Sequence, residues 1–251
     1  MRKATHRIQR RDTLGSINEN VVPKVIHFVS KTHCLTQNFL DNIDHWKFPD
    51  FTVLLHDDED VNELFESLED SVSNGLYRAI QCLPNNGTST PSKADVFRYP
   101  LLYLYGGVYA DIDNAPEKDP PRMDHDAWLV LNKRGKPNSN LLVFAPRHPL
   151  MYMSLELALT RLLQVGNMSK QNAWKVTGPD VLRTALQAFT GQETFEPGVY
   201  NVTVDGNDRS VTIINSTYGR EAAIKGEAKQ RFYSLTGMTT WKGARTHYSN
   251  E

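Results

Sequence analysis

Short apolar runs alternate with helical patterns along much of the chain. The β-branched run at residues 21–30 and the run at 51–55 predict buried strands, because continuous apolar stretches between polar segments are typical of a sheet interior. Between these runs, apolar side chains recur at the spacing of one helix face, at Leu35, Phe39, Ile43 and Trp46. Strands and helices that alternate in this way predict an α/β fold with a mostly parallel sheet flanked by helices.

The rest of the chain extends this pattern. In chain order it predicts a helix from residue 92 to the glycines at 106–107, strands at 127–132 and 140–146, helices at 148–164 and 178–189, and strand-like runs at 199–204 and 210–216. No internal repeat or low-complexity linker interrupts it. We therefore predict a flexible basic N-terminal arm over residues 1–20 and a single domain over residues 21–251.

Composition and charge narrow the class of protein. Apolar residues make up 39% and charged residues 23% of the 251 residues, so the chain can bury a core. A net charge of −1 gives no reason to expect nucleic acid as a partner. Five Arg or Lys residues stand among the first eleven positions. They indicate either a solvated arm or a peripheral contact with anionic lipid headgroups.

Signals for the cellular compartment are few. No run approaches the ~18 apolar residues of a membrane span, and no apolar core follows the basic start, so neither a transmembrane segment nor a secretory signal is expected in this chain. Cys34 and Cys82 are too few for a disulfide scaffold and leave both a single bridge and two free thiols open. Slight support for a secretory lumen comes from four N-glycosylation sequons, which begin at Asn86, Asn167, Asn201 and Asn215.

The stretch SKADVFRYPLLYLYGGVYADID, residues 92–113, holds the most specific pattern. Ser92 and Asp95 have the spacing of a helix capping box, and Gly106 with Gly107 predicts a sharp helix end. Period-two alternation then predicts a short strand that carries its polar side chains on one face. On that face lie Tyr109, Asp111 and Asp113.

Two carboxylates on one face of a strand end need an explanation. Spaced roughly 6–7 Å apart along the backbone, Asp111 and Asp113 can turn their oxygens toward each other, and two carboxylates ~4 Å apart repel by about 4 kcal/mol at an effective dielectric near 20. A hard divalent cation would reverse the sign of this interaction. The alternative is that both residues only cap the turn that leads into the following loop.

The whole unit resembles the DXD region of glycosyltransferase family 32. The matching positions are Asp95, Arg98, Gly106, Gly107, Val108, Tyr109, Asp111 and Asp113. Three further segments resemble family blocks in the expected order, VPKVIHFVS, NSNLLVFAPRHPLM and TGPDVL, so that the likeness spans about residues 21–185. The last third matches poorly: where relatives carry a His followed by Ser-Trp, this chain has WKGARTHYSN with His247.

The resemblance implies a GT-A fold, a Rossmann-like α/β sheet with the DXD at a strand end. It also implies a retaining glycosyltransferase that moves a hexose to a hydroxyl of a glycan or glycolipid, with mannose as the favoured hexose. The donor would be GDP-mannose or a UDP-hexose, and the cofactor Mn²⁺ or Mg²⁺. Front-face substitution, with the leaving diphosphate accepting the acceptor proton, is favoured over a carboxylate nucleophile.

By the same resemblance, Asp113 is expected to hold the metal, with Asp111 on the metal or the ribose and His247 as a further ligand. Arg98 would contact phosphate or sugar oxygens, and Asp95 would accept bonds from sugar hydroxyls. Helix capping for Asp95 and an ion pair for Arg98 are the plainer alternatives. Five further residues could line the pocket of the nucleotide sugar, or could instead serve only core packing or backbone structure. They are His27, Phe28, Tyr109, Asn140 and Gly178.

Three other functions fit parts of this pattern. A nucleotide-sugar hydrolase would use the same pocket with water as the acceptor. A catalytically inactive nucleotide-sugar or carbohydrate-binding module would keep the fold without the reaction. A structural metal-binding domain is disfavoured, because two acids on a strand end do not form a closed ligand set.

Overall fold

A computed structural model of the chain describes residues 19–68, 90–114, 116, 121, 123–132, 134–164 and 173–214. Several expectations fall outside these residues. They concern nearly all of the N-terminal arm, Cys82, His247 and the sequons at Asn86, Asn167 and Asn215. Within the described part, no helix combines the length and the apolar character needed to cross a membrane.

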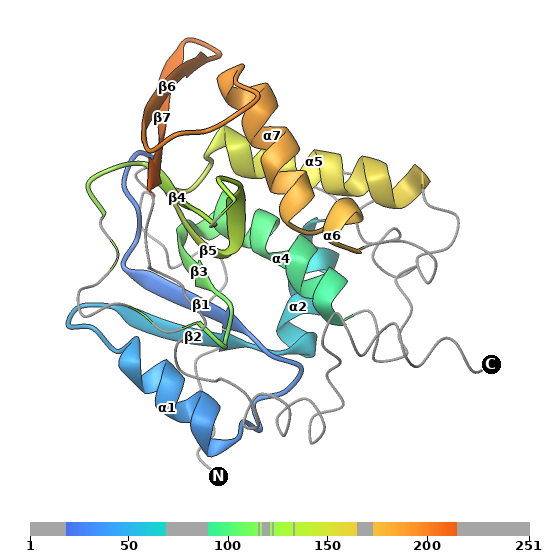
Figure 1. Cartoon of the computed structure of the whole chain (residues 1–251). Coiled ribbons are helices and arrows are strands. Elements are labelled where there is room, and N and C mark those ends of the chain that lie inside the picture. The colour runs from blue at the N-terminus through green and yellow to red at the C-terminus, as the bar shows by residue number, and fades with distance from the viewer. Residues whose placement is uncertain are drawn as a thin grey trace.

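The described strands form one sheet of seven, in the order β2-β1-β3-β5-β4-β7-β6 (Figure 1). The pairs β1/β2, β1/β3 and β4/β7 are parallel, and β3/β5, β4/β5 and β6/β7 are antiparallel. The strands are β1 (Val25–Val29), β2 (Thr52–His56), β3 (Gly107–Ala110), β4 (Ala127–Leu131), β5 (Pro137–Phe144), β6 (Gly198–Val204) and β7 (Asn207–Ile214).

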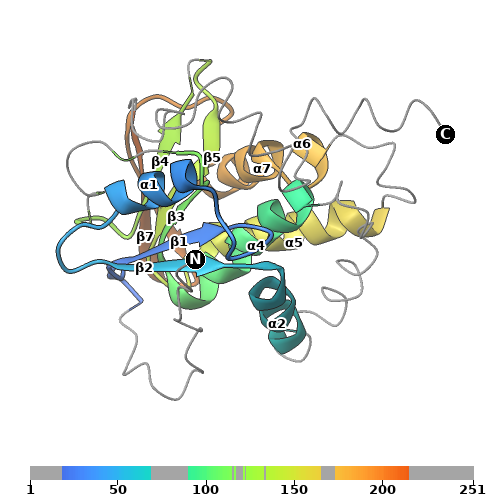
Figure 2. The same ribbon diagram turned by 90° about the horizontal axis from the view of Figure 1, so that it is seen from below.

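Helices cover both faces of the sheet, which confirms the α/β class. The helices are α1 (Gln37–His45), α2 (Asp58–Leu68), α4 (Thr90–Tyr105), α5 (Pro149–Gln164), α6 (Ala173–Val176) and α7 (Pro179–Thr190). Apolar residues of α1 pack with one face of the sheet, while those of α2, α4, α5 and α7 join a second core on the other face. Figures 1 and 2 show α1 well apart from the group formed by α4, α5 and α7.

Strand β3 lies between these two cores, so its side chains alternate between them. Val108 and Ala110 join the core beneath α1, and Tyr109 joins the core beneath α4. Because β1, β2 and β3 run parallel, their carboxyl ends meet at one edge of the sheet. This is the edge at which ligands usually bind in open α/β sheets.

Two details of the predicted 92–113 unit are corrected. Helix α4 begins at Thr90, two residues before Ser92, so Ser92 lies inside the helix and is not its N-cap. Strand β3 ends at Ala110, and Ile112 and Asp113 lie in a turn. The period-two argument therefore stops before the aspartates, and their arrangement is set by tertiary contacts with that turn rather than by strand alternation.

The double glycine has the predicted role. Helix α4 ends at Tyr105, and Gly106 and Gly107 have φ angles of 65° and 100°, in the region that favours glycine. A Cβ on Gly107 would lie 2.6 Å from the carbonyl oxygen of Val25, because β3 enters the sheet directly beside β1. The glycine is needed both for its backbone conformation and for this close approach.

We expect Gly107→Ala to lower the free energy of unfolding by about 2–3 kcal/mol, the sum of backbone strain and overlap with β1. The measurement is urea unfolding followed by circular dichroism. Gly135→Ala is the matched control, because Gly135 also has positive φ, 67°, but a Cβ there would meet nothing within 4 Å. Equal losses in the two variants would show that the contact with Val25 contributes nothing.

Three histidines are buried in the cores as neutral groups. Nε2 of His27 lies 3.2 Å from the carbonyl oxygen of Gly106 and must donate to it, so Nδ1 accepts from Nε2 of His56 at 3.0 Å. Burial lowers the pKa of His27 to about 4 and that of His148 to about 4, and places the pKa of His56 well below 6.5. The folded protein therefore resists protonation at these sites.

These histidines predict a pH dependence of stability with a definite sign. An unfolded histidine binds a proton near pH 6.5 and a folded one only near 4, so their stabilising contribution is complete above 6.5 and is lost as the pH falls toward 4. Each site adds a slope approaching ~1.4 kcal/mol per pH unit. Imidazole nitrogen shifts in NMR spectra, recorded in buffer and in urea, measure both protonation equilibria. Native titration of His27 near 6.5 would contradict the prediction.

Candidate active site

The centre of the site is a buried ion pair on α4. Asp95 and Arg98 are 5% and 4% exposed, and Nη2 of Arg98 lies 2.5 Å from Oδ1 of Asp95. Burial raises the pKa of Asp95 to about 6, while the charge of Arg98 opposes the rise. At neutral pH the carboxylate is therefore largely ionised, and the guanidinium of Arg98 lies close to Tyr109 of β3 and to Asp111.

Arg98 connects three parts of the fold. Its guanidinium donates to the carbonyl oxygen of Ser139 on β5, Nε donates to the carbonyl oxygen of Ala94, and the group lies 4.6 Å above the ring of Tyr109. Nη1 is 3.6 Å from Oδ1 of Asp111. Because protein groups accept from all three of its nitrogens, the arrangement favours an electrostatic role for Arg98 toward both aspartates over a bidentate grip on phosphate.

Asp111 follows β3 immediately and faces this charge. The hydroxyl of Tyr109 donates to Oδ1 of Asp111 at 3.2 Å. The side chain of Asp111 keeps 35% of its surface accessible, enough to contact a ligand. Burial nevertheless raises its pKa to about 7, the charge of Asp113 adds to the rise, and Arg98 opposes it. Burial is therefore the main obstacle to ionising this carboxyl, and the nearby charge of Arg98 favours the ionised form.

The turn that precedes α7 contacts the ion pair. Gly178 precedes this helix, and a Cβ there would come within 3.1 Å of Oδ2 of Asp95. The Thr177 hydroxyl lies 3.5 Å from the same oxygen. Tyr99, one turn beyond Asp95, donates from its hydroxyl toward the carbonyl oxygen of Thr177 at 3.2 Å. The TGPD turn is thereby fixed against α4, and Gly178 allows the close approach to Asp95.

The pairing of β5 with β4 is irregular beside the site. The register between β4 and β5 shifts between Leu129 and Val130, which pair with Leu142 and Asn138. The carbonyl oxygen of Asn140, within this interval, accepts from the amide of Asp111 at 2.8 Å. Bulges of this kind are common beside active sites because they redirect the chain. The hydrogen bond between Asp111 and Asn140 continues the β3–β5 pairing one residue beyond the end of β3.

The residues present fit a divalent cation. Two acids stand one residue apart just beyond the end of β3, and the side chain of Asp111 keeps 35% of its surface accessible. The charge of Asp113 adds to the rise in the pKa of Asp111 that burial causes. Hard cations such as Mn²⁺ and Mg²⁺ take carboxylate oxygens of this type as ligands and commonly use substrate phosphates and waters for the rest. Asp111 and Asp113 would hold the ion, and His247 lies outside the described residues.

Two residues considered for the nucleotide pocket lie in the core. His27 is 3% exposed and is bonded through both ring nitrogens, and Phe28 is fully buried with its ring 5.8 Å from that of Trp46. These are the core positions that the sequence left open as an alternative. Tyr109, Asn140 and Gly178, in contrast, all lie against the ion pair or the turn that follows β3.

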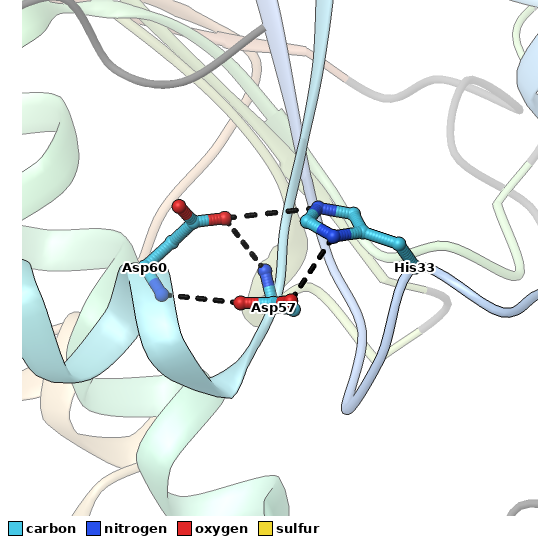
Figure 3. A group of neighbouring side chains, drawn as sticks. All are labelled: His33, Asp57 and Asp60. Carbon is cyan, nitrogen blue, oxygen red and sulfur yellow. Dashed lines mark hydrogen bonds and ion pairs between the residues drawn. The ribbon is translucent and has the colours of Figure 1, made fainter. Parts of the chain in front are cut away.

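A second acidic cluster occurs at the same edge of the sheet (Figure 3). Nδ1 of His33 lies 3.0 Å from Oδ2 of Asp57, and its Nε2 lies 3.8 Å from Oδ2 of Asp60. Asp57 caps α2 by accepting from the amide of Asp60, and Asp60 accepts from the amide of Asp57 in return. This reciprocal capping and the ion pairs account for the cluster without a metal.

The sequence did not identify several residues of the site. Thr177 and Tyr99 carry no signal of their own, although Thr177 stands in the TGPD segment that resembles the family. Asn42 and Trp46 of α1 bind the turn that contains Asp113. For Asn42 a signal existed: it is a polar residue between Phe39 and Trp46 on the face of α1 that is otherwise apolar.

With this geometry established, the comparisons with known proteins identify the class. Residues 21–133 match the family model described as the glycosyltransferase sugar-binding region containing a DXD motif. The resemblance inferred from the sequence is confirmed for this region: it is similar to the sugar-binding region of DXD-containing glycosyltransferases, and the curated matches support the family-32 type. The matched residues include β1, β2, α4 and β3 together with Asp95, Arg98, Asp111 and Asp113.

Two curated yeast proteins are similar to this chain. Inositol phosphoceramide mannosyltransferase 3 of Schizosaccharomyces pombe is 28% identical over 135 residues, which cover 52% of this chain and 35% of that protein. Mannosyl phosphorylinositol ceramide synthase SUR1 of Saccharomyces cerevisiae is 27% identical over 150 residues, which cover 54% of this chain and 34% of that protein. The chain thus matches about a third of the length of each relative.

Among solved structures, the PaToxG glycosyltransferase is similar, with a TM-score of 0.49 and 18% sequence identity. The likeness covers 67% of this chain and 70% of that one.

Proposed function

We propose that this protein is a metal-dependent, retaining glycosyltransferase that moves a hexose, with mannose first, from a nucleotide-sugar donor to a hydroxyl of a glycan or glycolipid. The observation that carries the proposal is the accessible carboxyl of Asp111, which lies 3.6 Å from Arg98 and one residue from Asp113, just beyond the end of β3. The match of this region to the DXD family model supports it. A GT-A arrangement, with the donor at the carboxyl ends of β1 and β3, is part of the proposal.

Within this proposal the chain's own residues have separate tasks. Asp113 and Asp111 would hold Mn²⁺ or Mg²⁺, which when bound neutralises the charge of a departing diphosphate. Arg98 favours the ionised forms of Asp95 and Asp111 and holds Asp95 in an ion pair. Asp95, against the Thr177–Gly178 turn, would accept hydrogen bonds from sugar hydroxyls, and that turn would border the sugar. No carboxylate is assigned as a nucleophile.

The relatives favour mannose and a lipid acceptor. Both curated proteins are named for mannosyl transfer to inositol-containing ceramides. GDP-mannose is therefore the first donor to test, with UDP-hexoses after it. The names also favour a glycolipid over a soluble glycan as acceptor. A Golgi or other secretory compartment agrees with the exposed position of the Asn201 sequon on β6.

The test is a donor screen with purified protein and Mn²⁺. GDP-mannose, UDP-glucose, UDP-galactose and UDP-N-acetylglucosamine are offered separately, with and without inositol phosphoceramide and with and without EDTA. We expect one donor to be consumed, an EDTA-sensitive rate, and a glycolipid product with retained anomeric configuration. Consumption that is unchanged by the acceptor and yields only free sugar would favour the hydrolase. Folded protein that binds a donor and consumes none would favour the inactive binding module.

A further inference from the structure

Helix α1, which is distant in the sequence, holds the turn that contains Asp113. Nδ2 of Asn42, on α1, donates to the carbonyl oxygens of Ile112 and Asn114 at 2.7 and 2.6 Å. Nε1 of Trp46, one turn further along the helix, donates to the same oxygen of Asn114 at 2.9 Å. These two carbonyls flank Asp113 on either side, so its backbone is fixed at both ends.

The same turn is tied to the sheet through Asn114. Its amide donates to the carbonyl oxygen of Asp111 at 2.8 Å, and its Nδ2 donates to the carbonyl oxygen of Asn140 at 2.6 Å. Asp111 is therefore held directly by β5 and by its own side-chain contacts with Tyr109 and Arg98. The hydrogen bonds from Asn42 and Trp46, in contrast, act on the part of the turn that contains Asp113.

A purely structural role does not account for Asn42 well. It is fully buried, and its Oδ1 has no hydrogen-bond partner among the described residues. A buried acceptor without a partner is unfavourable, and an apolar side chain of similar size would pack on this face of α1 without that cost. The amide is thus explained by what its two donors do for the carbonyls of Ile112 and Asn114.

We propose that Asn42, Trp46 and Asn114 form a positioning clamp that sets the orientation of Asp113, and with it the affinity of the DXD turn for its divalent cation. The proposal rests on the function proposed above. Groups that orient metal-binding carboxylates through hydrogen bonds typically contribute 10–100-fold to metal affinity. None of the three residues is a catalytic residue, because each acts only through the backbone of the turn.

The test compares Asn42→Leu and Trp46→Phe with Ile43→Ala and with the wild type. Both clamp variants leave an apolar side chain on α1 but remove donors, whereas Ile43→Ala weakens the packing of the same helix and leaves the clamp intact. Binding of Mn²⁺ alone, and of Mn²⁺ with GDP, is measured by electron paramagnetic resonance. We expect the dissociation constant for Mn²⁺ to rise about tenfold in Asn42→Leu and less in Trp46→Phe, with no change in Ile43→Ala.

Amide hydrogen exchange gives a readout that needs no metal. Exchange within residues 111–114 should accelerate in Asn42→Leu and stay unchanged in Ile43→Ala, even where the two variants melt at the same temperature. Wild-type Mn²⁺ affinity and exchange in Asn42→Leu would overturn the clamp. If instead wild-type protein binds Mn²⁺ no more tightly than Asp113→Asn does, the proposed function itself is wrong, which separates the two failures.

Discussion

Replacing Asp113 by asparagine is expected to reduce the rate of sugar transfer about a thousandfold while the protein stays folded. Asparagine keeps the shape of the side chain but removes the charge that a divalent cation requires. Stabilisation of a departing diphosphate by a bound cation is worth several kcal/mol, and about 4 kcal/mol corresponds to a thousandfold. Initial rates with the preferred donor, at saturating Mn²⁺, measure the loss.

Asp113 is a cleaner probe than Asp111. Asp111 also contacts Tyr109 and Arg98, so its substitution would disturb the packed site as well as the metal. The control is Asp124→Asn, which removes an equal charge from a side chain that is 60% exposed. Full activity in Asp113→Asn would remove the metal from the proposed mechanism, and equal losses in both variants would indicate a non-specific charge effect.

Replacing Arg98 by methionine is expected to lower the free energy of unfolding by about 3–5 kcal/mol. Methionine fills most of the space but leaves Asp95 buried without its partner, at 5% exposure. It also removes the positive charge 3.6 Å from Asp111. An uncompensated buried charge accounts for most of such losses. Urea unfolding at pH 7.5, where Asp95 is ionised in the wild type, measures the change.

Two further variants isolate the buried charge. The double variant Asp95→Asn/Arg98→Met should be more stable than Arg98→Met, because no charge is left buried at position 95. Arg134→Met, at an exposed position, should change stability by no more than about 0.5 kcal/mol. A double variant as unstable as the single one would show that lost packing, and not the charge of Asp95, causes the effect.

The local elements of this fold follow from the sequence because short-range rules decide them. Continuous apolar runs predicted β1, β2 and β4, and helical spacing predicted α1 and α5. Two glycines with positive φ end α4 as predicted. The exceptions are local too. The short helix α6, Ala173–Val176, was not predicted, because four residues are too few to show a helical period. The start of α4 was placed too late, since turn-forming residues at its beginning resemble a loop.

In the candidate site, too, the sequence indicated some features and the tertiary structure alone showed others. Asp95, Arg98, Asp111 and Asp113 could be proposed from the sequence because they stand within one segment whose spacing resembles a family. The sequence could not show that Arg98 uses its donors on Ser139, Asp95 and Ala94, since those contacts depend on how β5 and α4 pack. It equally could not place His27 in the core, because a histidine in a strand fits a pocket and a core position alike.

The sequence by itself determined the local elements and singled out the candidate site residues, because helix, strand and turn preferences, together with the spacing of the DXD segment, act over a few neighbouring positions. Only the tertiary structure decided how the acidic turn is held. Strand β3 ends at Ala110, so no strand period reaches Asp113, and the turn takes its shape from Asn42, about 70 residues away. Contacts of that kind form when two distant surfaces pack, and no local pattern in either segment specifies the other.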